Sequence, residues 1–243
     1  QTFRSEFIHA SRLKLGPLFS FAVTRTKKRV CLHADFHHLI FDGFTMDLFL
    51  RDLKNALSGQ HVQEETADYA DFTRAQQAMM SGDGAKEYDS YFAALFENYE
   101  SPTQITPDLP KTEQAGKASI VRTPVSQADV ERAVGRTGVS EAAFFLSALY
   151  YTAARLTNSD SVYLSTISSG RSDVRFSDTY GMFVNTLPLS SVLSRGNIDD
   201  YIRNTAEDYR QAIAHENYPF AAVASQWGFS VQLMYAYQRG IVQ

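Results

Sequence analysis

The chain has 243 residues, of which 44% are hydrophobic and 21% charged, so its composition is that of a globular protein with one large or two modest cores. The net charge of −4 lacks the basic footprint of a nucleic-acid-binding protein, and no apolar run approaches the length of a membrane span. The single cysteine, Cys31, excludes a disulfide framework and favours a reducing, cytoplasmic location.

Two alternating segments near the N-terminus predict an antiparallel hairpin. Apolar and polar residues alternate over 19–24 and again over 30–37, and the charged residues between them predict the turn. Apolar residues at helical spacing over 46–57 then predict a helix. The segment between that strand and that helix is therefore a loop held by two rigid elements.

This loop carries the sequence H-H-x-x-x-D-G, from His37 to Gly43. Histidine exchanges protons near neutral pH, which makes His38 and His37 candidates for acid–base chemistry. We expect Asp42 either to orient His38 or to hold the turn by pairing with a distant arginine. Gly43 is expected to allow a backbone conformation, or a close approach, that a side chain would block.

The loop has two other possible interpretations. The first is a polar strand end with a solvated histidine pair and a helix-opening aspartate. The second is a metal site, because His33, Asp35 and His37 share one strand face with the spacing of a facial triad. The remaining histidines offer no convincing fourth partner and no jelly-roll pattern surrounds the segment, so we predict no metal.

Further along the chain, periodicity predicts helices and strands in mixed order. Helices are expected over 68–79 and 88–99, the second with an aromatic stripe that suits a core, then over 126–138, 141–156 and 198–215. Strands are expected over 119–124, 162–168, 181–189 and 231–237. Residues 101–118 are rich in proline and lack periodicity, which predicts a crossover between two lobes.

Three further motifs follow H-H-x-x-x-D-G: Y-x-D-F at 69–72, G-x-F-V-N-T at 181–186 and H-x-x-Y-P-F at 215–220. Together, and in this order, they resemble the condensation domains of non-ribosomal peptide synthetases, which belong to the chloramphenicol-acetyltransferase-like superfamily. The resemblance implies an α/β (α+β) fold, a two-lobed sandwich with mixed sheets and flanking helices. It places an N-terminal lobe portion at 1–100, a crossover linker at 101–118 and a C-terminal lobe portion at 119–243.

The chain departs from the family pattern in three places. The strands and the arginine-bearing motif that precede H-H-x-x-x-D-G in the family are absent, the arginine-rich segment is reduced to 221–229, and Ser190 replaces the usual arginine. We therefore expect an internal or shortened portion of such a domain, incomplete at the N-terminal lobe.

The resemblance implies amide formation between a donor acyl or peptidyl thioester and an acceptor aminoacyl thioester. Both substrates are carried on the phosphopantetheine of peptidyl carrier proteins, so no cofactor is expected on the domain itself, and an adenylation domain is the expected neighbour. His38 would take a proton from the attacking amine or position it.

The other motif residues receive supporting roles by the same resemblance. His37 supports the loop, and Gly43 offers an N–H to the oxyanion. We hypothesise that Asp42 forms a bidentate pair with Arg171 that ties the two lobes together. Asn185, a polar insert in an apolar run, is satisfied either by backbone groups or by facing a cavity, and is a weaker candidate for the floor of the site.

Two competing functions remain open from the sequence. One is a coenzyme A-dependent acyltransferase of the same superfamily, and the other is a non-catalytic module that docks carrier proteins. The residues after Gly43 are unlike those of epimerising relatives, and the intact histidine pair disfavours heterocyclising ones. The donor and acceptor amino acids are not predicted.

Overall fold

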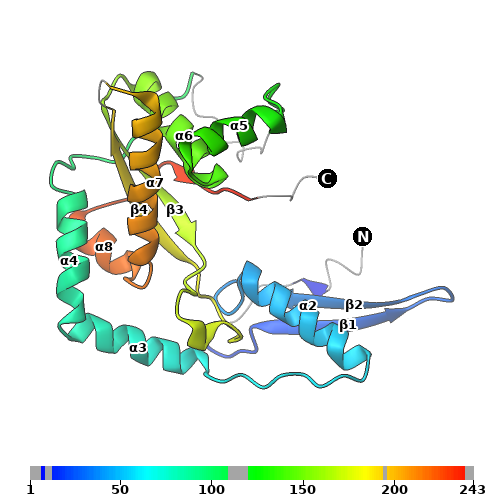
Figure 1. Cartoon of the computed structure of the whole chain (residues 1–243). Helices are drawn as coiled ribbons and strands as arrows, with labels where there is room; N and C mark the ends of the chain where they lie inside the picture. Colours follow the sequence, from blue (N-terminus) through cyan, green and yellow to red (C-terminus); the bar gives the residue numbers. More distant parts are fainter. Residues whose placement is uncertain (1–6, 9–12, 109–119, 194–195, 239–243) are drawn as a thin grey trace. The chain divides into compact units, whose positions relative to one another are not determined.

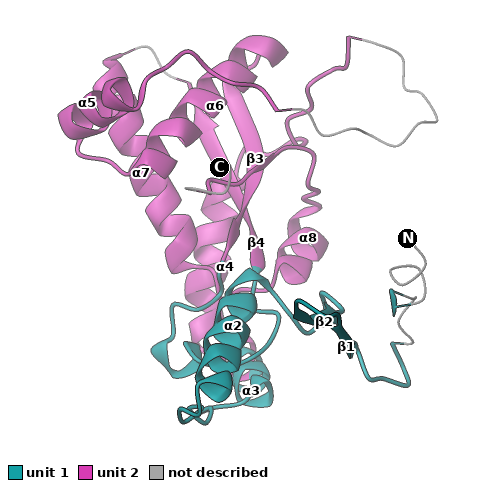
Figure 2. Cartoon of the chain, turned by 90° about the vertical axis from the view of Figure 1, so that its right-hand side faces the viewer, with its two compact units in different colours: residues 1–77, 169–184 teal, residues 78–168, 185–243 magenta. Residues whose placement is uncertain are grey.

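The computed structural model describes residues 7–8, 13–108, 120–193 and 196–238 (Figure 1). The chain divides into two compact units, each built from two segments (Figure 2). Unit 1 comprises Gln1–Gln77 and Ser169–Val184, and unit 2 comprises Ala78–Ser168 and Asn185–Gln243. Each unit is described by itself.

In unit 1, the predicted hairpin is confirmed. Strands β1 (Phe19–Arg25) and β2 (Val30–Phe36) pair antiparallel, with Phe19 opposite Phe36 and Arg25 opposite Val30. Helix α2 (Gly43–Leu57) runs alongside the hairpin (Figure 1). Phe49 on the helix packs against Phe21 and Phe36, with ring centroids 6.0 and 5.3 Å apart. This aromatic contact fixes the strand relative to the helix on either side of the histidine loop.

Helix α2 begins where the sequence predicted, because Asp42 is its N-cap. The Asp42 carboxylate accepts a hydrogen bond from the backbone N–H of Thr45 at 2.7 Å, which satisfies one of the free N–H groups of the first turn. Helix α3 (Tyr69–Ser81) follows after a loop, and the division between the two units falls within it. It starts at the Y-x-D-F motif, as predicted.

Unit 2 is a three-stranded sheet covered by helices on both faces. The strand order is β4-β3-β5, where β3 (Ser161–Ser168) pairs antiparallel with β4 (Asn185–Val192) and parallel with β5 (Met234–Tyr235). Strand β3 is buried along nearly its whole length, which requires a layer on each face.

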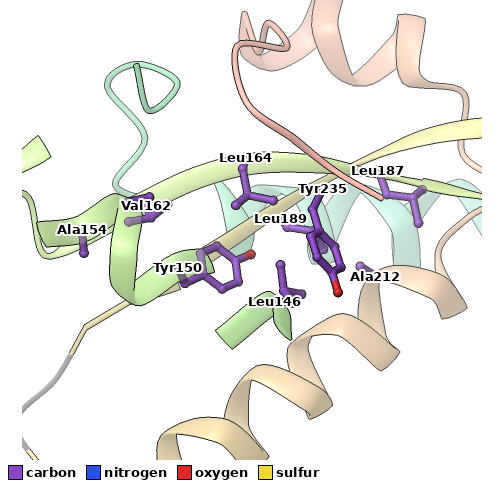
Figure 3. Close-up of a cluster of buried hydrophobic side chains, with 10 residues drawn as sticks. Leu146, Tyr150, Ala154, Val162, Leu164, Leu187, Leu189, Ala212 and Tyr235 are labelled. Atoms are coloured by element: carbon purple, nitrogen blue, oxygen red, sulfur yellow. The ribbon is translucent and has the colours of Figure 1, made fainter. Parts of the chain in front are cut away.

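One face of the sheet packs against helices α6 (Glu141–Thr157) and α7 (Ile198–Ala214), and Figure 3 shows the side chains of this core. The opposite face packs against α4 (Gly84–Leu95) and α8 (Phe220–Trp227), where Phe92, Tyr218 and Phe229 are almost fully buried. The aromatic stripe predicted over 88–99 therefore belongs to a core, as expected. Tyr163 of β3 packs in this second core, whereas Val162 and Leu164 pack in the first.

Capping residues define the remaining helix, α5 (Gln127–Thr137), and the start of α6. Ser126 and Ser140 accept hydrogen bonds from first-turn N–H groups, and Gly138 ends α5 with a left-handed φ of 73°. Both helices lie where the sequence predicted them. No helix in the described ranges combines the length and apolarity that crossing a membrane requires.

Three predicted strands differ from the structure. Residues 120–124 form no strand, and Ser119 lies outside the described residues. Strand β4 begins at Asn185 rather than at Gly181, because 181–184 are bonded to unit 1 instead. Pro188 therefore lies inside β4 rather than closing it, which is tolerated because β4 is an edge strand. The last strand is only two residues long.

The compact units do not follow the predicted lobe boundaries. Residues 78–100 belong to unit 2, since α4 contributes to its aromatic core, and 169–184 belong to unit 1. Of the predicted linker, 109–118 lie outside the described residues. Its first part is attached to β3, where Thr103 exchanges two hydrogen bonds with the backbone of Tyr163.

Candidate active site

The loop between β2 and α2 presents one exposed histidine in a defined tautomer. The Nδ1 of His38 lies 2.8 Å from the carbonyl oxygen of Phe41. A carbonyl only accepts, so Nδ1 carries a proton and donates it, and in the neutral imidazole the lone pair is therefore on Nε2. His38 is exposed, whereas Phe41 beside it is buried. Nε2 has no hydrogen-bond partner among the residues that the structure describes.

His37 stabilises the same loop. Its Nδ1 accepts a hydrogen bond from the backbone N–H of Leu39 at 3.1 Å, and its side chain is half-buried. An imidazole that accepts at Nδ1 is neutral, because a protonated ring has no acceptor. The contact joins the His37 ring to the backbone of its own loop, and the supporting role of His37 stays a prediction.

The carboxylate of Asp42 is directed away from His38. Besides capping α2, it accepts a hydrogen bond from the backbone N–H of Phe183 at 2.9 Å and lies 3.6 Å from the guanidinium of Arg171. Of the two roles open to Asp42, the structure therefore shows pairing with an arginine, and the Phe41 carbonyl is what orients His38. Both charged side chains are buried, with 0% exposure for Asp42 and 3% for Arg171.

The geometry of this pair differs from the one predicted. A single Nη2–Oδ1 approach replaces the bidentate contact, because Arg171 directs Nη1 to the carbonyls of Phe176 and Thr179, each at 2.8 Å. The expected tie between two lobes is also wrong for the compact units, since both residues lie in unit 1. Burial lowers the pKa of the Arg171 guanidinium, and the charge of Asp42 partly offsets this effect.

Thr45 is bonded to both members of the Asp42–Arg171 pair. Its hydroxyl accepts from Arg171 Nη2 at 3.0 Å and donates to the carbonyl of Gly181 at 2.7 Å, and the Gly181 N–H lies 3.2 Å from the same oxygen. Thr45 is fully buried. The hydroxyl therefore joins the first turn of α2 to both ends of the 169–184 segment.

Aromatic rings complete the setting of Arg171. Its guanidinium lies over the ring of Phe44 at 4.7 Å and over that of Phe183 at 4.0 Å. Phe183 also packs on Phe72, with ring centroids 4.7 Å apart, and the hydroxyl of Tyr69 donates to the carbonyl of Met182 at 2.7 Å. The Y-x-D-F and G-x-F-V-N-T motifs therefore meet at this site.

Two glycines permit the close packing of the 169–184 segment. Gly170 has a φ of +65°, and a Cβ added there would lie 2.0 Å from the carbonyl oxygen of Phe183. A Cβ on Gly181 would lie 2.3 Å from the ring of Tyr69. A second contact holds the same segment to α2, where Arg51 and Asp178 form an ion pair at 2.6 Å.

Gly43 does not fit the reason predicted for it. Its φ is outside the left-handed region, and a Cβ there would meet nothing within 4 Å. The special backbone conformation expected for Gly43 is therefore wrong, and the space beside it is open. Neither Gly43 nor Phe44 has a partner for its backbone N–H in the part of the chain that the structure describes.

Asn185 lies in unit 2, where its amide is satisfied by backbone groups. Its Nδ2 donates to the carbonyls of Glu216 and Tyr218 at 2.8 and 2.7 Å, and its Oδ1 accepts from the N–H of Phe220 at 3.2 Å. Of the two environments predicted, backbone satisfaction is the one observed. The side chain joins β4 to the H-x-x-Y-P-F segment.

The possible metal ligands do not converge. His33 Nε2 is hydrogen-bonded to Thr24 Oγ1 at 2.9 Å. Over the described ranges, no three His, Cys, Asp or Glu side chains are grouped closely enough to hold a metal ion.

Sequence reasoning missed Thr45, Phe44, Phe183 and Gly181 as parts of this site. Thr45 carries no local signal, because its partners are distant in sequence. Gly170 and Gly181 flank a segment whose one regular element is the short 3-10 helix Val174–Phe176, and these glycines were the available hints of close backbone packing.

The chain is thus a mixed α/β protein with an exposed histidine on the loop between a strand and a helix. The family model of the Condensation domain matches residues 1–230, so the chain belongs to the condensation domain family. Surfactin synthase subunit 1 of Bacillus subtilis (strain 168) is 25% identical over 222 residues, which are 89% of this chain.

Solved structures agree with this family. The first condensation domain of the calcium-dependent antibiotic synthetase superposes with a TM-score of 0.68 at 22% identity, over 91% of this chain and 55% of that one. The starter condensation domain of rhizomide synthetase, solved with C8-CoA, superposes with a TM-score of 0.69 at 20% identity. The match covers 96% of this chain and 55% of that one. The predicted chloramphenicol-acetyltransferase-like fold is thereby confirmed. The chain spans 6% of the surfactin subunit and about half of these structures.

Proposed function

We propose that this chain takes part in amide-bond formation between a donor acyl or peptidyl thioester and an acceptor aminoacyl thioester. The observation that supports this most is the exposed His38, whose Nδ1–H is donated to the Phe41 carbonyl. This bond orients the ring and places the lone pair of the neutral imidazole on Nε2. A base with a defined tautomer is what removal of a proton from an attacking amine requires.

In the proposed reaction, the acceptor nitrogen forms a bond to the thioester carbonyl carbon while a proton passes from nitrogen to His38 Nε2. The C–S bond of the tetrahedral intermediate then breaks, and the departing thiolate takes the proton back. General-base catalysis contributes about 10²–10⁴-fold, and holding the amine in place contributes independently of proton transfer.

The neighbouring groups have supporting roles in this proposal. The unpartnered N–H groups of Gly43 and Phe44 at the start of α2 offer donors to the oxyanion, and the charge of the Asp42 carboxylate at the same helix end is paired with Arg171. His37, Asp42 and Arg171 hold the loop. Asn185 acts on the H-x-x-Y-P-F segment of unit 2.

The proposal includes the substrates' carriers. Donor and acceptor would arrive on the phosphopantetheine of peptidyl carrier proteins, next to an adenylation domain and in the cytoplasm, with no cofactor on the chain itself. Membership of the family supports these partners.

A second candidate is acyl transfer from coenzyme A. The starter condensation domain of rhizomide synthetase was solved with C8-CoA, and the present chain shares its fold. Coenzyme A and a carrier protein present the same pantetheine thioester, so the same histidine would serve both donors. The two candidates are separated by which donor is consumed.

The test uses the full chain within its natural polypeptide, with loaded donor and acceptor carrier proteins, and intact mass as the measurement. We expect the acyl group to move to the acceptor and His38→Ala to remove most of the transfer. His61→Ala is the matched control, since His61 is exposed on the loop after α2. Unimpaired transfer by His38→Ala would contradict the mechanism, and consumption of acyl-coenzyme A alone would favour the second candidate.

A further inference from the structure

Unit 2 contains a cavity that the proposed reaction does not use. Its volume is about 410 Å³, within the range of small-molecule sites, and residues of α4, α7 and the end of β4 line it. Its polar lining includes Ser190 and Ser191 of β4 and Asn204, Asp208 and Gln211 of α7.

Asp208 is the one charged side chain among the residues that line the cavity. Across the described ranges, no group donates a hydrogen bond to its carboxylate or forms an ion pair with it. Its neighbour Glu207, by contrast, is bonded to both Arg210 and Gln211. Surrounding protein nevertheless raises the pKa of Asp208, and the charge of Glu207 adds to this effect. Asp208 is exposed, so its carboxylate is open to solvent as well as to the cavity that it lines.

The wall beside Asp208 is fixed by its own contacts. The ring of Tyr91 stacks on His215, with centroids 3.9 Å apart, and His215 Nδ1 donates to the carbonyl of Gln211 at 2.7 Å. The hydroxyls of Tyr201 and Ser191 are 3.2 Å apart. The shape of the cavity therefore does not depend on a ligand.

The remaining residues that line the cavity could bind a small molecule with a polar head and a short alkyl chain. Ala94, Leu95, Leu189 and Val192 supply apolar surface, while the amide oxygens of Asn204 and Gln211 are acceptors. Tyrosine rings also attract cations. A carboxylate, acceptors and aromatic rings around an apolar wall together select positive charge on a short carbon chain.

We propose that this cavity binds a small organic cation, with an ammonium or guanidinium head paired to Asp208. The alkyl stem lies against the apolar wall between α4 and β4. A planar guanidinium would form two bonds to the carboxylate, and an ammonium one. This inference does not rest on the proposed reaction, because binding is measured directly.

The test titrates the full chain with butylguanidinium and with butylammonium by calorimetry, and with butylurea as the neutral isostere of the first. We expect saturable binding of at least one cation and none of butylurea. Asp208→Asn should weaken binding by about tenfold or more. Glu207→Gln is the matched control, because it removes the same charge one residue away, and it should change affinity less than about twofold.

A second variant tests whether the probes bind in this cavity, and it does so without removing the charge of Asp208. Ser190→Arg introduces a guanidinium from the β4 wall, which should pair with Asp208 and exclude both probes. Circular dichroism confirms that each variant is folded. The proposal is overturned if neither cation binds the unmodified chain, if butylurea binds as tightly as butylguanidinium, or if Asp208→Asn binds like the unmodified chain.

Discussion

Asp42 and Arg171 form a buried ion pair, 3.6 Å apart, although one caps α2 and the other begins an irregular segment far along the chain. Each side chain also bonds to backbone groups. Asp42 accepts hydrogen bonds from the N–H groups of Thr45 and Phe183. Arg171 donates to the carbonyls of Phe176 and Thr179. The pair therefore ties the start of α2 to the 169–184 segment.

Removal of one partner of this pair should be strongly destabilising. Arg171→Met leaves the buried Asp42 carboxylate without its counter-charge and two carbonyls without their donor, so we expect the free energy of unfolding to fall by about 3–5 kcal/mol. Arg175→Met is the matched control, because Arg175 pairs with Asp173 at the surface and should cost less than about 1 kcal/mol. Urea unfolding measures both, and equal midpoints for the two variants would contradict the argument.

The hydroxyl of Thr45 should matter more than its volume. Thr45→Val keeps the shape of the side chain but leaves Gly181 and Arg171 each without one hydrogen-bond partner. We expect the free energy of unfolding to fall by about 1–3 kcal/mol for each of these buried groups. Thr45→Ser keeps the hydroxyl and loses one methyl group, at about 1 kcal/mol. Unfolding and acyl transfer are measured for both variants. A valine variant as stable as the serine variant would show that these bonds contribute little.

Gly170 should tolerate no side chain, because a Cβ there would clash with Phe183. Comparison with Gly59 separates this clash from the strain of a left-handed backbone. Gly59 and Gly170 have nearly the same φ, +68° and +65°, but a Cβ on Gly59 meets open space. Gly59→Ala should therefore cost only the backbone strain, about 1–2 kcal/mol. Gly170→Ala adds the clash with Phe183 and should abolish the cooperative unfolding transition. Similar transitions for the two variants would refute the packing argument.

The contributions of Asp208 and Glu207 to the free energy of unfolding should change in opposite directions as pH rises. The pKa of Asp208 is raised in the folded chain, so ionisation disfavours folding, and this cost grows as pH rises above the ordinary pKa of 3.8. Asp208→Asn should therefore gain stability relative to the unmodified chain as pH rises from acid to neutral.

Glu207 provides the comparison for that experiment. Its bonds to Arg210 and Gln211 lower its pKa to about 2, so its contribution is present above the ordinary pKa and is lost as pH falls toward 2. Glu207→Gln should lose stability relative to the unmodified chain over the same rise in pH. Thermal unfolding from pH 3 to pH 7, in steps of about one unit, measures both, and parallel curves for all three proteins would contradict the assignment.

The sequence by itself determined the local structure. Alternation predicted β1 and β2, helical spacing predicted α2, and the caps Ser126 and Ser140 marked α5 and α6, because each of these signals acts between residues close in the chain. The order of the four motifs also identified the family. The histidine loop was therefore placed correctly between its strand and its helix.

Only the tertiary structure decided how the loop is held. The partners of Thr45 and the exact contacts of Arg171 depend on the 169–184 segment, whose irregular backbone has no periodic signal. The same cause explains the misplaced start of β4, because residues 181–184 have a strand-like sequence but are bonded to α2 and α3 in unit 1. The tautomer of His38 likewise follows from where one backbone carbonyl points, which composition and spacing do not encode.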